Sequence, residues 1–422
     1  MPSVLSLQSQ PRLDLPAAVP TSTRISTLVP FLAHYSILKI NSFLLRAGGS
    51  MQFMQKFRVI AVLVVGAACA SCTHVEAFAH VDQATLAEAV RQYGQNKPPQ
   101  TAVAPPTQTH ADAALDPNEE KDYEQQLQVY LAQKDFSKLD AEARDVRASK
   151  SRISGGAWKL LLFYEAISTP ASGNDATDDE WQANISTLKD WVAAKPESAT
   201  ALIALAEAYL KYSDYGRGSG YANTVSADGW RKEGERAGLA ASALVQASHL
   251  KERCPYWYEA MQQVALAQGW DSARARELFD QAVAFEPDYY HFYREYANYL
   301  LPKWYGERGE VEAFAESASN QVGGPYGNFL YFEIATQLTC QCDSANSDME
   351  NLSWPKIKQG YADMGRMYGY STVKVNRFAL MAYEAQDKEA AQQAFAQIGA
   401  NWDLKSWHTQ SRFEQARAWA LN

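Results

Sequence analysis

The chain has 422 residues, of which 47% are hydrophobic and 21% are charged, and its formal net charge is −9. This length allows one or two substantial cores, and the composition is that of a folded globular protein rather than a disordered one. The negative charge and the lack of any Lys/Arg-rich run exclude a broad nucleic-acid surface, so we expect no nucleic-acid partner.

The first 71 residues have the features of an export signal behind an extension. Lys56 and Arg58 form a short basic region, Val59 to Val65 is apolar, and small residues follow up to Ser71. The apolar run is shorter than the about 20 residues that a membrane-spanning helix needs. We therefore predict a signal peptide at 51–71, and we interpret 1–50 as an unstructured extension from a start site placed too far upstream.

Cys72 directly follows the signal and is the candidate lipidation site. It resembles the cysteine of a bacterial lipobox, although Cys69 stands where such signals usually have Leu. The alternative is cleavage near Ala70 by an ordinary signal peptidase, which gives a soluble exported protein. Lipidation predicts a protein of the bacterial cell envelope that faces the periplasm and is held on the membrane by its N-terminal lipid.

Residues 72–118 are predicted to be a flexible linker between this anchor and the folded part. The segment from Gln92 to Glu119 is rich in Pro, Gln, Thr and Ala and has few large apolar groups, so it cannot bury enough surface to order itself.

Residues 119–422 show helical periodicity nearly throughout, as in the apolar face formed by Tyr123, Leu127 and Leu131. Further helices are expected at Ala157 to Ile167 and at Asp179 to Ala194. No hairpin signal joins two strand-like segments. The predicted class is all-α.

Several segments fit the 34-residue tetratricopeptide pattern, in which large residues alternate with small ones at fixed positions. The matching positions include Leu202, Leu205, Ala206 and Tyr209; Ala275, Phe279, Ala282 and Pro287; and Val375, Phe378, Ala382, Ala391 and Phe395. Small residues let paired helices approach while large ones fill the groove between them. The expected architecture is an irregular tetratricopeptide-like helical-hairpin solenoid with a disordered N-terminal tether.

The stretch "LLPKWYGERGE", residues 300–310, follows an aromatic stripe that includes Tyr289, Tyr293 and Tyr296. We expect this stripe to fill the inter-helix core, with an aromatic-lined groove for a peptide or glycan as the alternative. Pro302 should mark the end of the aromatic helix, and Glu310 should begin the next one. Trp304 and Tyr305 then either cap the core or face a groove.

Four segments carry a family resemblance: "YLKYSDYGRGSGYANTVSADGW", "PYWYEAMQQVALAQGW", "FEPDYYHFYREYANYLLPKWYGERGEVEAFA" and "NRFALMAYEAQDKEAAQQAFAQI". They are similar to the bacterial family called domain of unknown function four-zero-three-four, over roughly Tyr123 to Trp407. The part around Trp304 and Tyr305 is the most distinctive. The resemblance implies a tetratricopeptide-like helical fold in bacterial proteins that are often exported, and it implies no activity.

No motif for metal or cofactor chemistry is present. His249, His291 and His408 lack the spacing of a helix-borne zinc site, and "YGRGSGYA" lacks the spacing of a phosphate-binding loop. We expect no metal and no cofactor. The glycines of "YGRGSGYA" are interpreted as turn formers after a helix that ends near Tyr212, with Arg217 and Tyr221 as candidates for the mouth of a groove.

In an exported protein, one disulfide between Cys254 and either Cys340 or Cys342 is expected.

Two functions fit these observations. The first is a lipid-anchored binding or scaffold module with a protein partner and no chemistry, because no catalytic set is recognisable. The second is an enzyme acting on an envelope polymer. Its cleft would contain Trp304, Tyr305, Glu307 and Arg308 beside the loop from Arg217 to Tyr221, which requires the two segments to be neighbours.

Overall fold

The computed structural model describes residues 81–95, 115–218, 222–341 and 351–422, without the side chains of 174 and 339–341. All of these belong to one compact unit, residues 77–422. Within the described ranges the regular structure is helical, and an isolated antiparallel bridge between Arg152 and Trp158 takes the place of any strand. The predicted all-α class is confirmed. The predictions for residues 1–80, including lipidation of Cys72, lie outside the described residues.

Seventeen α-helices follow one another in the described ranges. They are α3 (Gln83–Gln95), α4 (Glu119–Ala132), α5 (Phe136–Ser149), α6 (Lys159–Ser168), α7 (Asp178–Ala194), α8 (Ala199–Arg217), α9 (Ala227–Ser248), α10 (Tyr256–Ala267), α11 (Ser272–Phe285), α12 (His291–Tyr299), α13 (Glu310–Val322), α14 (Gly324–Gln341), α15 (Trp354–Tyr368), α16 (Thr372–Glu384), α17 (Lys388–Ile398), α18 (Leu404–Trp407) and α19 (Gln410–Leu421).

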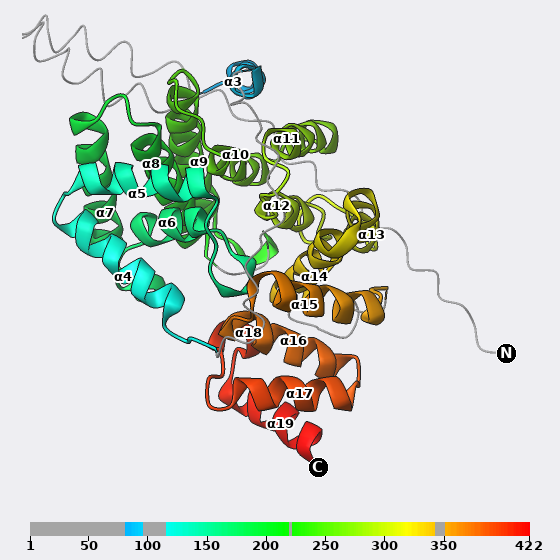
Figure 1. Cartoon of the computed structure of the whole chain (residues 1–422). Coiled ribbons are helices and arrows are strands. Elements are labelled where there is room, and N and C mark those ends of the chain that lie inside the picture. The colour runs from blue at the N-terminus through cyan, green and yellow to red at the C-terminus, as the bar shows by residue number, and fades with distance from the viewer. Residues whose placement is uncertain (1–80, 96–114, 219–221, 342–350) are drawn as a thin grey trace, which may run out of the picture. The chain divides into compact units, whose positions relative to one another are not determined.

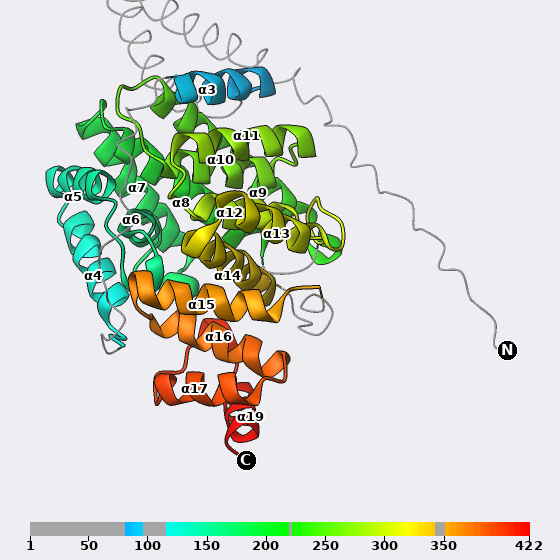
Figure 2. The same ribbon diagram turned by 45° about the vertical axis from the view of Figure 1, so that its right-hand side comes forward.

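The even-numbered helices from α4 to α16 form one continuous row. Each of them packs against the next even-numbered helix, so that α6 contacts α8, α8 contacts α10, and α10 contacts α12. The odd-numbered helices pack against this row as hairpin partners, as α9 does on α8 and α17 on α16. Figures 1 and 2 show the hairpins following one another from α4 to α19. This is a helical-hairpin solenoid, as the repeat pattern predicted.

Local sequence determines where these helices begin. Nine of them start behind a Ser, Thr or Asp whose side chain accepts a hydrogen bond from the backbone N–H three residues later: Asp135, Thr177, Ser198, Ser226, Asp271, Ser371, Asp387, Asp403 and Thr409. At Thr177 the Glu180 carboxylate also accepts a hydrogen bond from the backbone N–H of Thr177, which completes a capping box. Each such cap stabilises its helix by about 1 kcal/mol.

Alanine allows the closest helix pair, α8 and α9, to approach. Ala201, Ala204 and Ala208 of α8 and Ala237 and Ala240 of α9 are fully buried. Small side chains at such positions bring two helix backbones together, and the larger Leu and Tyr groups fill the space around them.

The turn at 300–310 has the predicted construction. The helix α12 ends at Tyr299, and α13 begins at Glu310 behind Gly309, whose φ of 86° is a left-handed conformation that suits glycine. The aromatic stripe before this turn is buried, and the Tyr296 ring stacks on Phe279 with centroids 4.7 Å apart. The other two predicted helices also appear, as α6 and α7.

The structure differs from the linker prediction at α3. Residues Gln83–Gln95 lie within the predicted linker 72–118, yet they form a helix whose Leu86, Val90 and Tyr93 are buried. The Tyr93 ring stacks on Trp257 at 4.0 Å, and its hydroxyl accepts a hydrogen bond of 2.8 Å from the N–H of Cys254. Apolar groups at this i, i+4, i+7 spacing are sufficient to dock a helix, although the surrounding composition is that of a linker.

A second difference concerns the end of α8. The helix was expected to end near Tyr212, because Gly216 and Gly218 follow, but it continues to Arg217 and ends at Gly218 with a φ of 83°. A glycine inside a helix costs only about 1 kcal/mol relative to alanine, which packing against α9 offsets. The extra turn places Asp214 and Arg217 on the same helix as Glu207.

Candidate functional site

A cavity of about 930 Å³ lies along the even-numbered row and is lined from α6, α7, α8, α9, α10, α12 and α14 and from the turn after α12. Its volume lies within the range of small-molecule binding sites. Successive repeats contribute one or more polar side chains each, so the cavity belongs to the solenoid as a whole. No single hairpin contains it.

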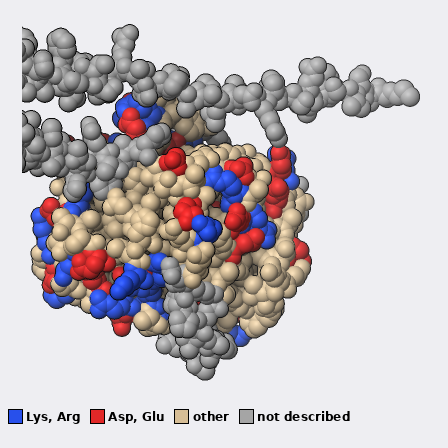
Figure 3. Space-filling model, turned by 90° about the horizontal axis from the view of Figure 1, so that it is seen from above, with Lys and Arg blue, Asp and Glu red and all other residues tan. Residues whose placement is uncertain are grey.

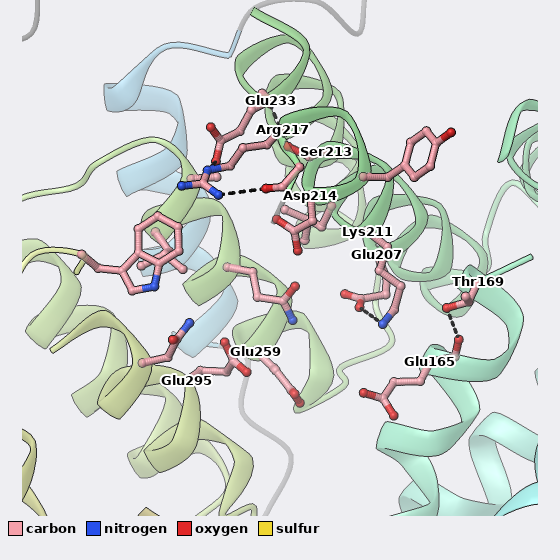
Figure 4. A pocket seen from close by; sticks show the side chains of 18 of the residues that line it. Glu165, Thr169, Glu207, Lys211, Ser213, Asp214, Arg217, Glu233, Glu259 and Glu295 are labelled. Carbon is pink, nitrogen blue, oxygen red and sulfur yellow. Dashed lines mark hydrogen bonds and ion pairs between the residues drawn. The ribbon is translucent and has the colours of Figure 1, made fainter. Parts of the chain in front are cut away.

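Six carboxylates face this cavity, which we call the acidic pocket: Glu165, Glu207, Asp214, Glu233, Glu259 and Glu295. Three cationic side chains line it as well, namely Lys211, Arg217 and Lys303. In Figure 4, Glu165, Glu207 and Asp214 approach the space from α6 and α8, while Glu259 and Glu295 approach it from α10 and α12. With every group ionised, the lining carries a formal charge of −3.

Glu207 is the most deeply buried of the carboxylates on α8, with 2% of its surface exposed. Its Oε1 lies 3.6 Å from Lys211 Nζ, which is longer than a hydrogen bond, and its Oε2 has no hydrogen-bond partner among the described residues. Burial raises the pKa of Glu207 against the opposing effect of Lys211. Burial also opposes charge on Lys211, but Glu207, Glu165 and Asp214 outweigh it and raise the pKa of the ammonium group.

Two further carboxylates come from facing helices. Glu259 on α10 is buried and accepts a hydrogen bond of 2.6 Å from the Tyr289 hydroxyl. Burial, and then the neighbouring charge of Glu295, hold the pKa of Glu259 well above its ordinary value. Burial also raises the pKa of Glu295 on α12 to about 7, although Arg294 opposes this effect. A raised carboxyl pKa in a cavity is characteristic of functional sites.

One border of the pocket is built by Arg217 and Trp304. The Arg217 guanidinium lies 5.1 Å from the centroid of the Trp304 ring and 5.2 Å from that of Trp230. Its Nε is 3.6 Å from Glu233, whose pKa burial raises to about 7 although Arg217 opposes the shift. Stacking of a guanidinium on an aromatic face is a cation–π contact. It joins the last turn of α8 to the turn between α12 and α13.

The structure therefore brings together the two segments that the sequence marked. Arg217 and Trp304 both line the acidic pocket, and Tyr305 stacks on Tyr299 and donates a hydrogen bond of 3.1 Å to the carbonyl of Leu266. Trp304 is partly buried against the core and Tyr305 is 42% exposed.

The remaining residues of that predicted set lie elsewhere. Glu307 and Arg308 are exposed on the turn and do not line the pocket. The backbone N–H of Glu307 donates a hydrogen bond of 2.8 Å to Glu310, at the start of α13. Glu307 and Arg308 therefore belong to an exposed turn, and Glu310 begins α13 as predicted. Tyr221 lies outside the described residues.

Among the cysteines, Cys254 is a buried free thiol whose sulfur lies 3.5 Å from the Tyr164 hydroxyl. The side chain of Cys340 and the whole of Cys342 lie outside the described residues. The predicted disulfide stays a prediction.

The part of the chain that the structure describes contains no group of three or more His, Cys, Asp or Glu side chains arranged to hold a metal ion. Nor does any described helix have the length and apolar character to cross a bilayer. On the face shown in Figure 3, basic and acidic side chains are interspersed.

We did not predict the pocket carboxylates from the sequence, although their spacing in the sequence contains a signal for them. Glu207, Lys211 and Asp214 recur at i, i+4 and i+7 in α8, an otherwise apolar helix rich in Ala and Leu. Glu259 and Gln263 repeat that spacing in α10. A polar stripe on a buried helix indicates a polar cavity, because an unpaired buried charge is too costly to persist in an apolar core.

The fold and the pocket define a class: an all-α helical-hairpin repeat protein with an acidic cavity along its even-numbered row of helices. No family model, curated protein or solved structure matches the chain.

Proposed function

We propose that this protein is a binding module of the bacterial envelope, exported and anchored through a lipid on Cys72, which binds a protein partner at the acidic pocket. The observation that carries the proposal is the cavity of about 930 Å³ to which five consecutive even-numbered helices contribute. Repeat stacks commonly use the surface of their inner helices for binding. The border of the pocket is formed by Arg217 and Trp304, residues of the types enriched at interaction hot spots.

Export and anchoring rest on the sequence of residues 51–72, and the resemblance of the repeat region to an often exported bacterial family supports the same compartment. Mass spectrometry of the mature N-terminus tests this part. We expect a diacylglycerol-modified Cys72, and an unmodified cysteine would contradict the anchor while leaving the binding proposal in place.

Site-specific photo-crosslinking tests the binding proposal. Tyr215 lines the pocket and is 43% exposed, whereas Val129 on α4 is 50% exposed and does not line it. A photoreactive residue in place of Tyr215 should give a crosslinked species in intact cells that the same residue in place of Val129 does not give. Equal or absent crosslinking at the two positions would contradict the proposal.

One observation favours a second function. Glu295 and Glu259 interact in the same cavity, both with raised pKa values, and a carboxyl group that is protonated near neutral pH can act as a general acid. We propose as the alternative an enzyme acting on an envelope polymer, with these residues in the roles that Glu307 and Arg308 were expected to fill.

Release of soluble fragments from isolated cell-wall polymer tests the alternative. Such release should be lost in Glu295→Gln and kept in Glu389→Gln, a variant of an exposed residue on α17. Absence of release by the unmodified chain would exclude this enzyme.

A further inference from the structure

With all six carboxylates ionised, the acidic pocket would carry more negative charge than its own cations compensate. Burial raises the pKa of Glu233 and Glu295 to about 7, so protons offset part of this charge when no ligand is bound. Its six carboxylates face three cationic side chains, of which Lys211 lies beside Glu207 and Arg217 lies beside Glu233. The surrounding carboxylates raise the pKa of Lys211 in spite of its burial, so the pocket favours positive charge. An additional cation would complete the compensation.

A second observation points to a ligand. The buried Oε2 atom of Glu207, which lines the pocket, has no hydrogen-bond partner among the described residues. Buried polar atoms in folded proteins are nearly always hydrogen-bonded, because an unmet carboxylate oxygen is costly. The Glu207 side chain faces the cavity in Figure 4, where a ligand N–H would reach it.

The distribution of the carboxylates determines the kind of cation. Because no three of them meet within the described residues, the pocket offers no chelating set for a metal ion. They are instead distributed over α6, α8, α9, α10 and α12 around the cavity, which Trp181 and Trp304 also line. Separated carboxylates match separated ammonium groups, and aromatic faces suit both ammonium groups and the methylene chain between them.

We infer that the acidic pocket binds an extended organic cation with two or more primary ammonium groups on an aliphatic chain. The inference rests on the proposed binding function and specifies the chemistry of its ligand. Two sources supply this chemistry: a free aliphatic polyamine, and neighbouring lysine side chains on a segment of a partner protein.

Isothermal titration calorimetry on the full chain tests the inference, with spermidine and trilysine as separate probes. At least one of the two should give a saturable heat with a single class of site. Saturation by spermidine alone assigns a free polyamine, and saturation by trilysine alone or more tightly assigns a protein segment. Fully acetylated spermidine has the same chain without its charges and should give no saturable heat.

Variants locate the site. Glu207→Gln and Glu295→Gln keep the shape of the side chain and remove one charge each, so each should weaken binding about tenfold or more. Glu389→Gln is the matched control on an exposed surface and should bind as the unmodified chain does. Circular dichroism checks that each variant is folded, and if a pocket variant does not fold, the comparison of spermidine with its acetylated form on the unmodified chain decides.

Three results would overturn the inference: no saturable heat with either cation, equal binding of acetylated and free spermidine, or competition by Mg²⁺ at concentrations as low as those of spermidine. The proposed function would survive these results if a crosslink at position 215 still formed. It would fail, and the inference would stand, if spermidine bound while no crosslink formed.

Discussion

Two glutamates in the same row of helices have opposite surroundings. Glu333 on α14 has no exposed surface, and its carboxylate contacts both Lys374 on α16 and Arg294 on α12, the latter at 3.3 Å. Glu207 on α8 is 2% exposed, and one cation, Lys211 at 3.6 Å, opposes its charge, while the Tyr256 side chain also acts to lower its pKa. In the C-terminal repeats the buried charge is compensated within the chain, whereas around α8 to α12 it is left facing a cavity.

The two regions show that one repeat architecture can use buried charge either to hold helices together or to form a site. A buried carboxylate that two cations oppose holds neighbouring helices in register, and the chain loses much when one of these cations is removed. A buried carboxylate without a full set of partners reduces stability, and it persists at positions that serve binding or catalysis. The comparison predicts different responses to mutation in the two regions.

The largest effect is expected at Lys374. Lys374→Met removes the α16 partner of Glu333 and leaves a buried carboxylate that only Arg294 opposes. We expect a loss of about 3–5 kcal/mol in the free energy of unfolding, measured by urea denaturation.

The control for Lys374 is Lys134→Met. Lys134 makes an ion pair of 2.7 Å with Asp190, and both side chains are more than half exposed. Its loss should cost less than about 1 kcal/mol. Equal losses at Lys374 and Lys134 would contradict the view that the α12–α14–α16 charges act as a buried network.

The next largest effect is a difference between two positions in how a Glu→Gln substitution changes the free energy of unfolding. Glu333→Gln should destabilise the fold by about 2 kcal/mol, because the buried Lys374 and the partly buried Arg294 each lose an anionic partner. Glu207→Gln should leave the free energy of unfolding unchanged or raise it by about 1 kcal/mol, because it removes a poorly partnered buried carboxylate. Chemical denaturation of both variants makes the measurement. A large loss in Glu207→Gln would assign that residue a structural role.

The pH dependence of the free energy of unfolding should reflect the raised pKa values of the pocket carboxylates. The pKa values of Glu233 and Glu295 are raised from 4.5 to about 7, so the folded chain binds more protons than the unfolded chain between these pH values. The free energy of unfolding should therefore fall as the pH rises from about 5 to 8.

Glu295→Gln should reduce this fall by on the order of 1 kcal/mol, a figure that allows for solvent screening. Part of the fall should persist, because Glu384 on α16 also has a pKa of about 7 as a result of burial. Thermal melts at several pH values measure the effect, and Glu389→Gln should leave the profile unchanged. An unchanged profile in Glu295→Gln would contradict the raised pKa.

The smallest effect concerns the border of the pocket. A double-mutant cycle with Arg217→Ala and Trp304→Ala should give a coupling of about 0.5–1 kcal/mol, which is the strength of a partly exposed cation–π contact. Urea denaturation of the two single variants and the double variant provides the data. Additive losses would mean that the ring and the guanidinium are neighbours without stabilising each other.

The sequence indicated much of this architecture because local signals specify local structure. The turn between α12 and α13 follows from Pro302 and Gly309, and the small and large residues of the repeats predict hairpins that pack in a row. Composition predicted a linker where α3 forms, because the three large side chains that this helix buries lie in a segment whose average composition is polar. The glycines after Tyr212 do not end the helix where we predicted, because the packing of α8 on α9 extends the helix to Arg217.

The sequence by itself determined the helical class and the hairpin repeats, and it marked the segments around Arg217 and Trp304 without deciding whether they meet. Only the tertiary structure decided which carboxylates are compensated and which face a cavity. The glutamates of α8 and α14 are alike in the sequence, since each stands in an apolar helix. Their environments differ because Glu333 is opposed by charges from α12 and α16, whereas Glu207 is opposed by Lys211 of its own helix. The distances between charges on different helices, which set their energy, exist only after the row has stacked.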